Sequence, residues 1–432
     1  MQTAEPVRLS TLSTDYARTG PDTLAGRYLR RFWQPVYHSV DLKHGRPVPI
    51  QIMGTSYTLY RGASGAAVLT DARCPHRGTQ LSSGWVEDDD LRCFYHGWKF
   101  AKDGACLEQP AEESKFCDRV RLQPRPVREY LGLIFAYLGE DNPPAFPLYP
   151  QFETFEGLLE VDSYFRHCNY FQNVENALDM SHVAFTHANN SASFQSIGLG
   201  SNLKALESDW GVAYTFRRDD GELRIQQFGM PNIFYMTALP TDPEIGWQES
   251  LFWWVPIDDE RHMQFSLHRV PVAGAAAETI DARRQKRRAE IDIPHQEACR
   301  QILRGEKRIE DFDERRIDLV RLQDDVAQIG QGIFADRNHE QMGRADVGVV
   351  AIRRLWRREL EAVANGGSLK EWRLTDDIRP RAWGIANTLS RVGHDDGNTD
   401  TQALATIIDI RPHIEIDIQL KALHSADRSF GA

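Results

Sequence analysis

Four residues that bind metals well stand in two short pairs in the first quarter of the chain. Cys74 and His76 lie one residue apart, and Cys93 and His96 lie two residues apart. Two thiolates and two neutral imidazoles suffice for a closed four-ligand site. Such a set could bind zinc tetrahedrally, or it could hold a two-iron cluster in which the cysteines bind one iron and the histidines bind the other.

The order of these ligands favours the iron–sulfur cluster over zinc. Each cysteine is followed closely by its own histidine, so each loop can give one ligand to each iron. A Cys2His2 zinc finger instead places both histidines on one helix. Both pairs lie in loops with Gly or Pro, "CPHRG" and "CFYHGW", and Phe94, Tyr95 and Trp98 are expected to limit solvent access there. A zinc-stapled binding protein is the alternative.

A second group of possible ligands lies in "YFQNVENALDMSHVAFTHANN", which contains Asp179, His182 and His187. Two histidines and a carboxylate bind non-haem Fe(II) in oxygenases and leave positions open for dioxygen and substrate. We expect a helix from about Gln172 to His187. On a straight helix the two histidines would lie about 140° apart, so a shared ion requires the helix to bulge or end between them.

The first motif resembles that of the Rieske non-haem iron oxygenases, and the likeness extends from about residue 20 to about residue 360. The downstream part is most similar to the phthalate dioxygenase-like branch of the aromatic-ring-hydroxylating oxygenases. The resemblance implies a Rieske [2Fe–2S] cluster on the first four residues. It also implies a mononuclear Fe(II) that uses O2 as co-substrate.

The resemblance assigns roles around the mononuclear iron. His182 and His187 would be two of its ligands. Asp179 would not be the third ligand, because in this family it bridges a cluster histidine of a neighbouring subunit, here His96, to His182. Asn176, one helical turn before Asp179, matches a family position near the iron.

The third iron ligand is expected in "LVRLQDDVAQIGQGIFADRNHEQMG". Alignment with the family places Asp324, rather than Asp325, at the ligand position. A helical wheel agrees, since Asp324 shares a face with Ile317, Val320 and Ala327. Without the resemblance, a solvated acidic pair would explain these two residues equally well.

The implied protein is the terminal oxygenase component of a multicomponent system. A separate NADH-dependent flavin or iron–sulfur reductase would supply electrons, and the chain would oxygenate an aromatic, carboxylated substrate by ring hydroxylation or cis-dihydroxylation. The alternatives are an O-demethylase acting on a methoxylated aromatic acid, and a Rieske electron carrier with a vestigial second site. Because the two metals of one subunit are expected to lie too far apart, the likeness implies a homotrimer or stacked trimers.

The strands and helices expected around these residues indicate an α+β protein. An all-β Rieske module should precede a catalytic domain of antiparallel sheet wrapped by helices, of the helix-grip or START-like kind. The Pro-rich "NPPAFPLYPQF" marks the boundary. The expected divisions are an N-terminal segment at 1–25, the Rieske domain at 26–141 and the catalytic domain at 142–432.

Three local patterns give more detailed expectations. The segment 49–71 has two apolar runs around a Gly-rich turn, which indicates a hairpin. "SLFWWVPIDDERHMQFSLHRVPV" indicates a second hairpin, turning at 258–261, with one buried face. The region 275–331 is charged and helical. Residues 345–367 predict a helix that ends at a Gly pair and buries Val349, Ile352, Trp356 and Leu360.

Composition excludes several other classes of protein. A net charge of -11 argues against electrostatic binding of nucleic acid. No stretch approaches the roughly 18 consecutive apolar residues of a membrane span, and the first 20 residues show no secretory signal. Six scattered cysteines are not a disulfide framework, which indicates a reducing, cytoplasmic setting.

Overall fold

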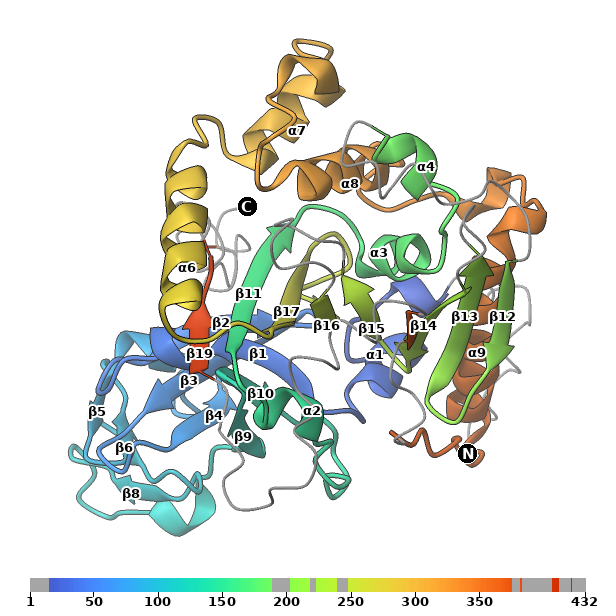
Figure 1. Ribbon diagram of the computed structural model, residues 1–432. Coiled ribbons are helices and arrows are strands. Elements are labelled where there is room, and N and C mark those ends of the chain that lie inside the picture. The colour runs from blue at the N-terminus through green and yellow to red at the C-terminus, as the bar shows by residue number, and fades with distance from the viewer. Residues whose placement is uncertain are drawn as a thin grey trace, which may run out of the picture.

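The N-terminal part of the chain is built from short antiparallel strands (Figure 1). The computed structural model describes residues 15–188, 203–217, 223–238, 248–374, 381–382, 406–411 and 421, so most of the expected N-terminal segment, residues 1–14, lies outside it. Helix α1 (Leu24–Leu29) precedes three sheets. Their strands are β1 (Gln34–His38), β10 (Leu133–Ala136) and β9 (Val127–Tyr130); β2 (Val48–Ile52), β3 (Thr55–Arg61) and β4 (Ala67–Asp71); and β5 (Trp85–Glu87), β6 (Asp90–Arg92), β7 (Lys99–Phe100) and β8 (Cys106–Glu108).

The segment 49–71 differs from its expected form. It contains three strands, β2 to β4, rather than one hairpin of two. The extra turn falls at Met53 and Gly54, whose φ angles of 51° and 77° both lie in the left-handed region. A tight turn of this kind is hard to see in the sequence, because methionine seldom adopts a positive φ.

One large sheet forms the core of the second half, in the order β12-β13-β14-β15-β16-β17-β11-β19, and β18 pairs with β14. Its described pairs are antiparallel except for β11 with β19. The predicted α+β architecture is therefore confirmed. The strands are β11 (Leu158–Arg166), β12 (Lys204–Glu207), β13 (Gly211–Arg217), β14 (Leu223–Gly229), β15 (Ile233–Ala238), β16 (Gln248–Pro256), β17 (His262–Val270), β18 (Arg381–Ala382) and β19 (Thr406–Asp409).

The two faces of this sheet have different neighbours, as strand β11 shows by its alternation. Oγ of Ser163 and Nε2 of His38 in β1 are hydrogen bonded at 2.7 Å. The odd-numbered residues of β11 therefore face the Rieske module. Even-numbered residues face the helices, because Asp162 pairs with Arg321 at 2.6 Å. The sheet thus separates the strand-rich module from the helical layer.

Helices cover the second face of the sheet (Figure 1). The region 275–331 is helical as predicted, and α9 confirms the predicted helix with its four buried apolar residues. It ends at Gly366, which has a left-handed φ of 63°. The described helices after α1 are α2 (Pro150–Glu153), which packs near Trp253 on the Rieske side, and α3 (Tyr170–Ala177), α4 (Val183–Thr186), α6 (Gly274–Ala289), α7 (His295–Leu303), α8 (Leu319–Ile329) and α9 (Val347–Asn365).

The predicted hairpin of β16 and β17 is present, and its turn falls at 258–261 as expected. The expectation of one buried face is wrong. Trp253, on the Rieske side, packs edge-on against Phe135, and Trp254, on the helix side, is 3% exposed. Both faces are buried because this sheet lies between two layers, which the sequence of a single hairpin does not reveal.

No helix among the described residues is both long and apolar enough to cross a membrane.

Candidate functional site

The first metal-binding motif forms two loops of matching geometry. The Cys74 loop follows β4, and the Cys93 loop joins β6 to β7. In each loop a glycine N–H donates to the carbonyl of the cysteine four residues earlier, Gly78 at 2.9 Å and Gly97 at 3.1 Å. The φ angles of these glycines, 75° and 70°, require the left-handed conformation that glycine adopts without strain.

The four side chains of the motif converge between the loops. The thiols of Cys74 and Cys93 are both buried, and a hydrogen bond between them, aided by backbone N–H groups, lowers the pKa of Cys93 to about 6. The rings of His76 and His96 lie 4.5 Å apart. Nδ1 of His76 is buried and has no hydrogen-bond partner among the described residues. Two thiols, two neighbouring imidazoles and an unpartnered buried nitrogen fit a cluster with mixed Cys and His ligation.

The aromatic residues around this cluster differ in their exposure. Trp98 is 2% exposed and stacks on His76 at 4.4 Å, so it shields the site as expected. Phe94 and Tyr95 instead point outward, 66% and 53% exposed, so the expectation that they limit solvent access is wrong. The partly exposed His96 therefore lies beside an apolar surface.

The second motif sits where a helix ends. The helical stretch expected from about Gln172 to His187 is interrupted, because α3 ends at Ala177 and a turn follows before the four-residue α4. His182 precedes α4 and His187 follows it. The break therefore comes before His182 rather than between the two histidines, which flank the single turn of α4 with their rings 5.4 Å apart.

Asp324 of α8 completes this group. Its Oδ1 lies 3.7 Å from Nε2 of His182 and 3.4 Å from Nε2 of His187. One donor atom from each of the three residues lies within 4.8 Å of the others, and among the described residues this is the one such group with three potential ligands. Asn176 donates to the same Oδ1 at 3.2 Å, as expected for a residue near the metal.

The outer nitrogens of both imidazoles are bound to acceptors. Nδ1 of His187 donates to Oε1 of Gln323 at 2.9 Å, and Nδ1 of His182 donates to the main-chain carbonyl of Asp179. A proton on each Nδ1 leaves the lone pair on each Nε2, the atom that faces Asp324. This is the tautomer that a metal ligand needs, so the residues fit a two-histidine, one-carboxylate iron site.

Burial and mutual charge shift the pKa values of Asp324, His187 and His182. Burial alone would raise the pKa of Asp324, but His187, His182 and Arg166 lower it well below its usual range. Burial lowers the pKa of His187, but the charge of Asp324 outweighs it, so the pKa of His187 is raised. At His182 burial dominates and the pKa is lowered. Asp324 therefore carries a negative charge at neutral pH, as an iron carboxylate ligand must.

The neighbouring Asp325 is not solvated. It is fully buried, and Arg166 of β11 donates to it at 2.5 Å. The same guanidinium donates to Asn173 of α3 and to Gln328 of α8. Arg166 therefore fixes α8 against β11 and α3 and so orients Asp324. The wheel argument for Asp324 is wrong, because Asp325 lies on the buried face while Val320 is only half-buried.

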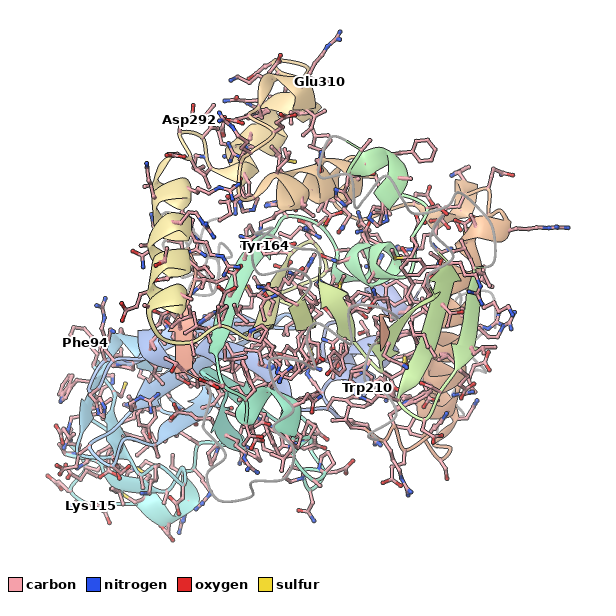
Figure 2. The ribbon with its side chains drawn as sticks, viewed as in Figure 1. Phe94, Lys115, Tyr164, Trp210, Asp292 and Glu310 are labelled. Carbon is pink, nitrogen blue, oxygen red and sulfur yellow. The ribbon has the colours of Figure 1, made fainter. Side chains whose placement is uncertain are left out.

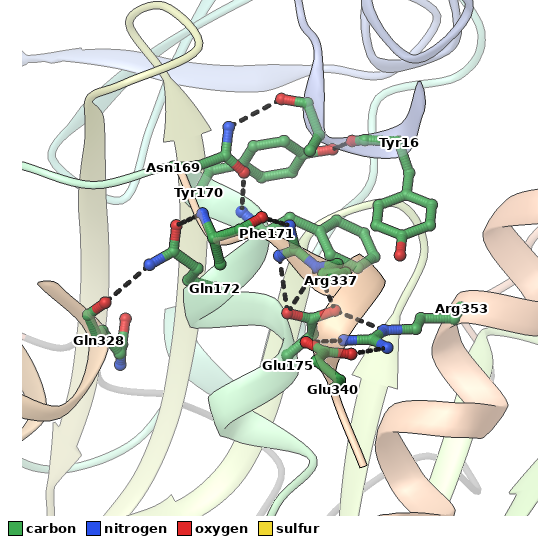
Figure 3. Close-up of polar contacts among 12 residues, drawn as sticks. Tyr16, Asn169, Tyr170, Phe171, Gln172, Glu175, Gln328, Arg337, Glu340 and Arg353 are labelled. Carbon is green, nitrogen blue, oxygen red and sulfur yellow. Dashed lines mark hydrogen bonds and ion pairs between the residues drawn. The ribbon is translucent and has the colours of Figure 1, made fainter. Parts of the chain in front are cut away.

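A second ionic network anchors α3, the helix that carries Asn176 (Figure 3). Glu175 accepts from Arg337 at 2.7 Å and from Arg353 of α9 at 2.6 Å. Arg353 also pairs with Glu340. The side-chain amide of Gln172 in α3 also donates to the carbonyl of Gln328 in α8 at 2.7 Å. These contacts join α3 to both α8 and α9.

Two basic residues that follow the histidines in the sequence, Lys204 of β12 and Arg217 of β13, are exposed. Sequence reasoning missed Arg166 and Gln323 as supporting residues. Only the position of Gln323 beside Asp324 could have pointed to it, and nothing local marks Arg166.

A strand-built module with mixed Cys and His ligands, joined to a sheet that carries two histidines and a carboxylate, defines a redox protein with two metal centres. Comparison with known proteins agrees. Residues 32–130 match the family model of the Rieske [2Fe-2S] domain. The chain is 32% identical over 377 residues to the 5,5'-dehydrodivanillate O-demethylase oxygenase subunit of Sphingobium sp. (strain NBRC 103272 / SYK-6), covering 81% of this chain and 80% of that one.

A second relative gives the same result. The phenoxybenzoate dioxygenase subunit alpha of Ectopseudomonas oleovorans is 33% identical over 375 residues, which cover 80% of this chain and 84% of the relative. The chain belongs to the Rieske non-haem iron oxygenases, as an oxygenase subunit. It is an oxidoreductase whose cofactors are a Rieske cluster and a mononuclear iron, with O2 as co-substrate.

Solved structures support the fold. The oxygenase in the oxygenase–ferredoxin complex of carbazole 1,9a-dioxygenase has a TM-score of 0.57 and 17% identity. The match covers 82% of this chain and 93% of that one. At this identity the likeness extends to the fold alone.

Proposed function

We propose that Cys74, His76, Cys93 and His96 hold the Rieske cluster and that His182, His187 and Asp324 hold the mononuclear iron. The observation that carries this assignment is the orientation of the two outer imidazoles, each with Nδ1 bound and Nε2 directed at Asp324. Asn176 restrains the Asp324 carboxylate by its hydrogen bond.

When bound, the two groups supply single electrons and the activation of dioxygen, and the chain supplies orientation and exclusion of water. Gln323 and the Asp179 carbonyl keep the imidazoles in the required tautomer. Arg166 and Asp325 hold α8 in place beneath them. Domain limits at 26–141 and 142–432 suit these roles, since the sheet face and the helical layer belong to the second division.

We further propose that the site functions between subunits. Phe94 of the Cys93 loop, labelled in Figure 2, lies on a separate side of the molecule from α4 and α8, which Figure 1 labels in the same view. Asp179 uses its carbonyl for His182, while its carboxylate accepts only the N–H of Ser181 among the described residues. The expected carboxylate link from Asp179 to His182 is thus replaced by the main chain, and the partly exposed carboxylate would accept a hydrogen bond from His96 of a second copy.

The exposed apolar side chains support such a contact. Phe94 and Tyr95 flank His96, and Phe185 of α4, 70% exposed, lies close to Asp179 in the sequence. Joining these surfaces head to tail would bury aromatic area beside both polar partners, and repetition of one such contact closes a ring. A homotrimer or stacked trimers is the assembly that we propose.

The redox donor that we propose is a separate NADH-dependent flavin or iron–sulfur reductase. A solved complex of a ferredoxin with an oxygenase of this fold supports a redox partner for this chain. None of the six cysteines, all of which are described, forms a disulfide, which suits a reducing cytoplasm.

The substrate that we propose is an aromatic acid, oxygenated by ring hydroxylation or cis-dihydroxylation. The two relatives are named for dehydrodivanillate and phenoxybenzoate, both aromatic carboxylates. O-demethylation of a methoxylated aromatic acid is the second candidate, favoured by the name of the first relative. Both reactions use the same residues at the iron, so the substrate decides between them.

The decisive experiment combines a substrate screen with two variants. Aromatic acids are tested for substrate-dependent oxygen uptake, ring diol and formaldehyde, with a reductase present. Asp324→Asn and His187→Ala should lose mononuclear iron and turnover while the visible and EPR spectra of the cluster are retained. Undiminished turnover in either variant would refute the ligand assignment, and a colourless preparation that binds only zinc would refute the cluster.

A further inference from the structure

The face of the large sheet that looks toward the helices carries an unusual set of polar residues at its centre. Because paired residues of antiparallel strands share a face, the register places Glu160, His268 and Ser250 in one row across β11, β17 and β16. Asp162 and Phe252 belong to the next row on the same face. A sheet face used only for packing would be apolar at these positions.

His268 and Phe252 keep partial solvent exposure although helices cover this face. Solvent-accessible space therefore lies above them. Nδ1 of His268 is hydrogen bonded to Oγ of Ser250 at 2.7 Å, and the imidazole packs edge-on against Phe252 at 5.5 Å. Burial lowers the pKa of His268 to about 4, so the imidazole is neutral at pH 7 and can present Nε2 to that space.

Three arginines from the covering helices approach the same rows. Arg284 of α6 pairs with Glu160, and Arg321 of α8 pairs with Asp162 at 2.6 Å. Arg288 lies one turn after Arg284 on the half-buried side of α6. It forms no hydrogen bond or ion pair within 4 Å with the described residues.

Arg288 and His268 share an electrostatic environment. The charges of Asp162 and Arg321 act on both groups, so the guanidinium and the imidazole lie close to the same ion pair. Asp281 and Asp409 also act on Arg288 without pairing with it. A half-buried guanidinium with no direct partner in the described part of the chain is a costly arrangement unless an anion joins it.

This polar row lies near the proposed iron ligands. Arg321 precedes Asp324 by three residues on α8, which is about 4.5 Å along the helix axis. Arg321 therefore links the row at Asp162 to the helix that carries Asp324. The half-buried Phe252 offers a face for that ring beside His268.

We propose that Arg288 and His268 bind the carboxylate of the substrate, with Ser250 orienting the imidazole and Phe252 contacting the ring. This inference rests on the proposed function, because it takes the aromatic acid as substrate. Arg288 supplies two parallel N–H donors and the charge, and His268 supplies one further N–H from Nε2 once the Ser250 hydroxyl donates to Nδ1. These residues determine which substrates bind, and the iron ligands do not depend on them.

The test measures binding by the holoenzyme, directly and without turnover. Wild-type protein loaded with both metal centres is titrated calorimetrically with 3-phenoxybenzoate, 3-methoxybenzoate and phthalate, and with the amide of each. We expect the acids to bind more tightly than the amides. Arg288→Gln should weaken the acids about 10- to 150-fold, the equivalent of one charged hydrogen-bonding group, and leave the amides unchanged.

Matched variants separate this effect from a folding defect. Arg287→Gln, at the adjacent arginine whose guanidinium donates to the carbonyl of Arg315, should bind every ligand as the wild type does. Arg288→Lys should keep part of the preference for acids. His268→Gln should reduce acid binding less than Arg288→Gln, and all variants should keep the iron content and the cluster spectrum of the wild type.

The two proposals fail in different ways. Equal binding of acids and amides by the wild type, or an unchanged preference in Arg288→Gln, would overturn the assignment of Arg288 and His268 while leaving the oxygenase function intact. If the wild type neither binds nor oxidises any acid of the panel, the aromatic-acid substrate itself is refuted, and this inference falls with it.

Discussion

Gln323 offers the sharpest test of how the iron site is held. Its side chain is 4% exposed and its Oε1 accepts the Nδ1 proton of His187 at 2.9 Å. In Gln323→Met the side chain keeps its length, but this acceptor is lost. His187 is itself 2% exposed, so water replaces the acceptor poorly.

The expected magnitude follows from that burial. An unsatisfied buried donor costs about 1–3 kcal/mol. The cost is felt when Nε2 binds a metal, because that state requires the proton on Nδ1. At about 1.4 kcal/mol per tenfold change, Fe(II) should bind roughly 5- to 150-fold more weakly. This range agrees with the roughly 10- to 100-fold loss typical of groups that support metal ligands.

The assay is an anaerobic Fe(II) titration. The mononuclear iron is removed by mild chelation, and the apo site competes with a chromophoric chelator for Fe(II) while the absorbance of the cluster is monitored. Gln331→Met, at an exposed glutamine two residues beyond α8, is the matched control and should bind Fe(II) as the wild type does. Gln323→Glu keeps an acceptor and should keep most of the affinity.

A dissociation constant for Gln323→Met within about twofold of the wild type would refute the reasoning, because a buried hydrogen bond lost at the ligand should change the affinity more than that. Loss of the cluster spectrum together with the iron would indicate general unfolding, and retained cluster absorbance identifies the local effect.

Three further outcomes are expected. Arg166→Met leaves Asp325 buried without its guanidinium partner and should lower the free energy of unfolding, measured in urea, by about 3–5 kcal/mol. The control Arg315→Met, at an exposed arginine, should lower it by less than about 0.5 kcal/mol. Equal losses in the two variants would contradict the role of Arg166. Burial lowers the pKa of His38 from 6.5 to about 3, so the unfolded chain binds a proton that the folded chain does not. Stability should therefore fall as the pH drops from about 6.5 towards 3, by up to about 1.4 kcal/mol per pH unit, and His38→Gln should remove that part of the slope in urea unfolding at several pH values. Gly78→Ala adds a Cβ at a φ of 75° and should lower the stability of the folded protein by about 1–2 kcal/mol. The variant should therefore lose the cluster absorbance at a lower temperature than the wild type does. A melting curve like that of the wild type would count against a strained turn.

The candidate cluster ligands could be selected from sequence because ligand chemistry fixes residue type and spacing, whereas Asp324 could be chosen only through the family resemblance. The pairs at Cys74 and Cys93 carry enough information to choose a cluster over zinc. Helix α9 was equally accessible, since its apolar face has the helical period and Gly366 ends it. These features are local, so the sequence around them contains their cause.

The features that sequence reasoning missed depend on distant partners. The break after Ala177 has no Pro or Gly to announce it, and it forms where His182 and His187 meet Asp324 of a separate helix. In the sequence Asp325 resembles a solvated acid, but in the structure it is buried in an ion pair with Arg166, which lies on a strand more than a hundred residues earlier. A buried arginine cannot be recognised from its neighbours in the chain, because its partners decide its burial.

Strand β11 has a consequence for how this chain can vary over evolution. Its odd-numbered residues serve the Rieske module and its even-numbered residues serve the helices around the iron, as Ser163 and Asp162 illustrate. Inserting or deleting a single residue within β11 would exchange the two sets and place Arg166 on the wrong side. We therefore expect members of this lineage to tolerate substitutions in β11 and to confine changes of length to the connections at its ends.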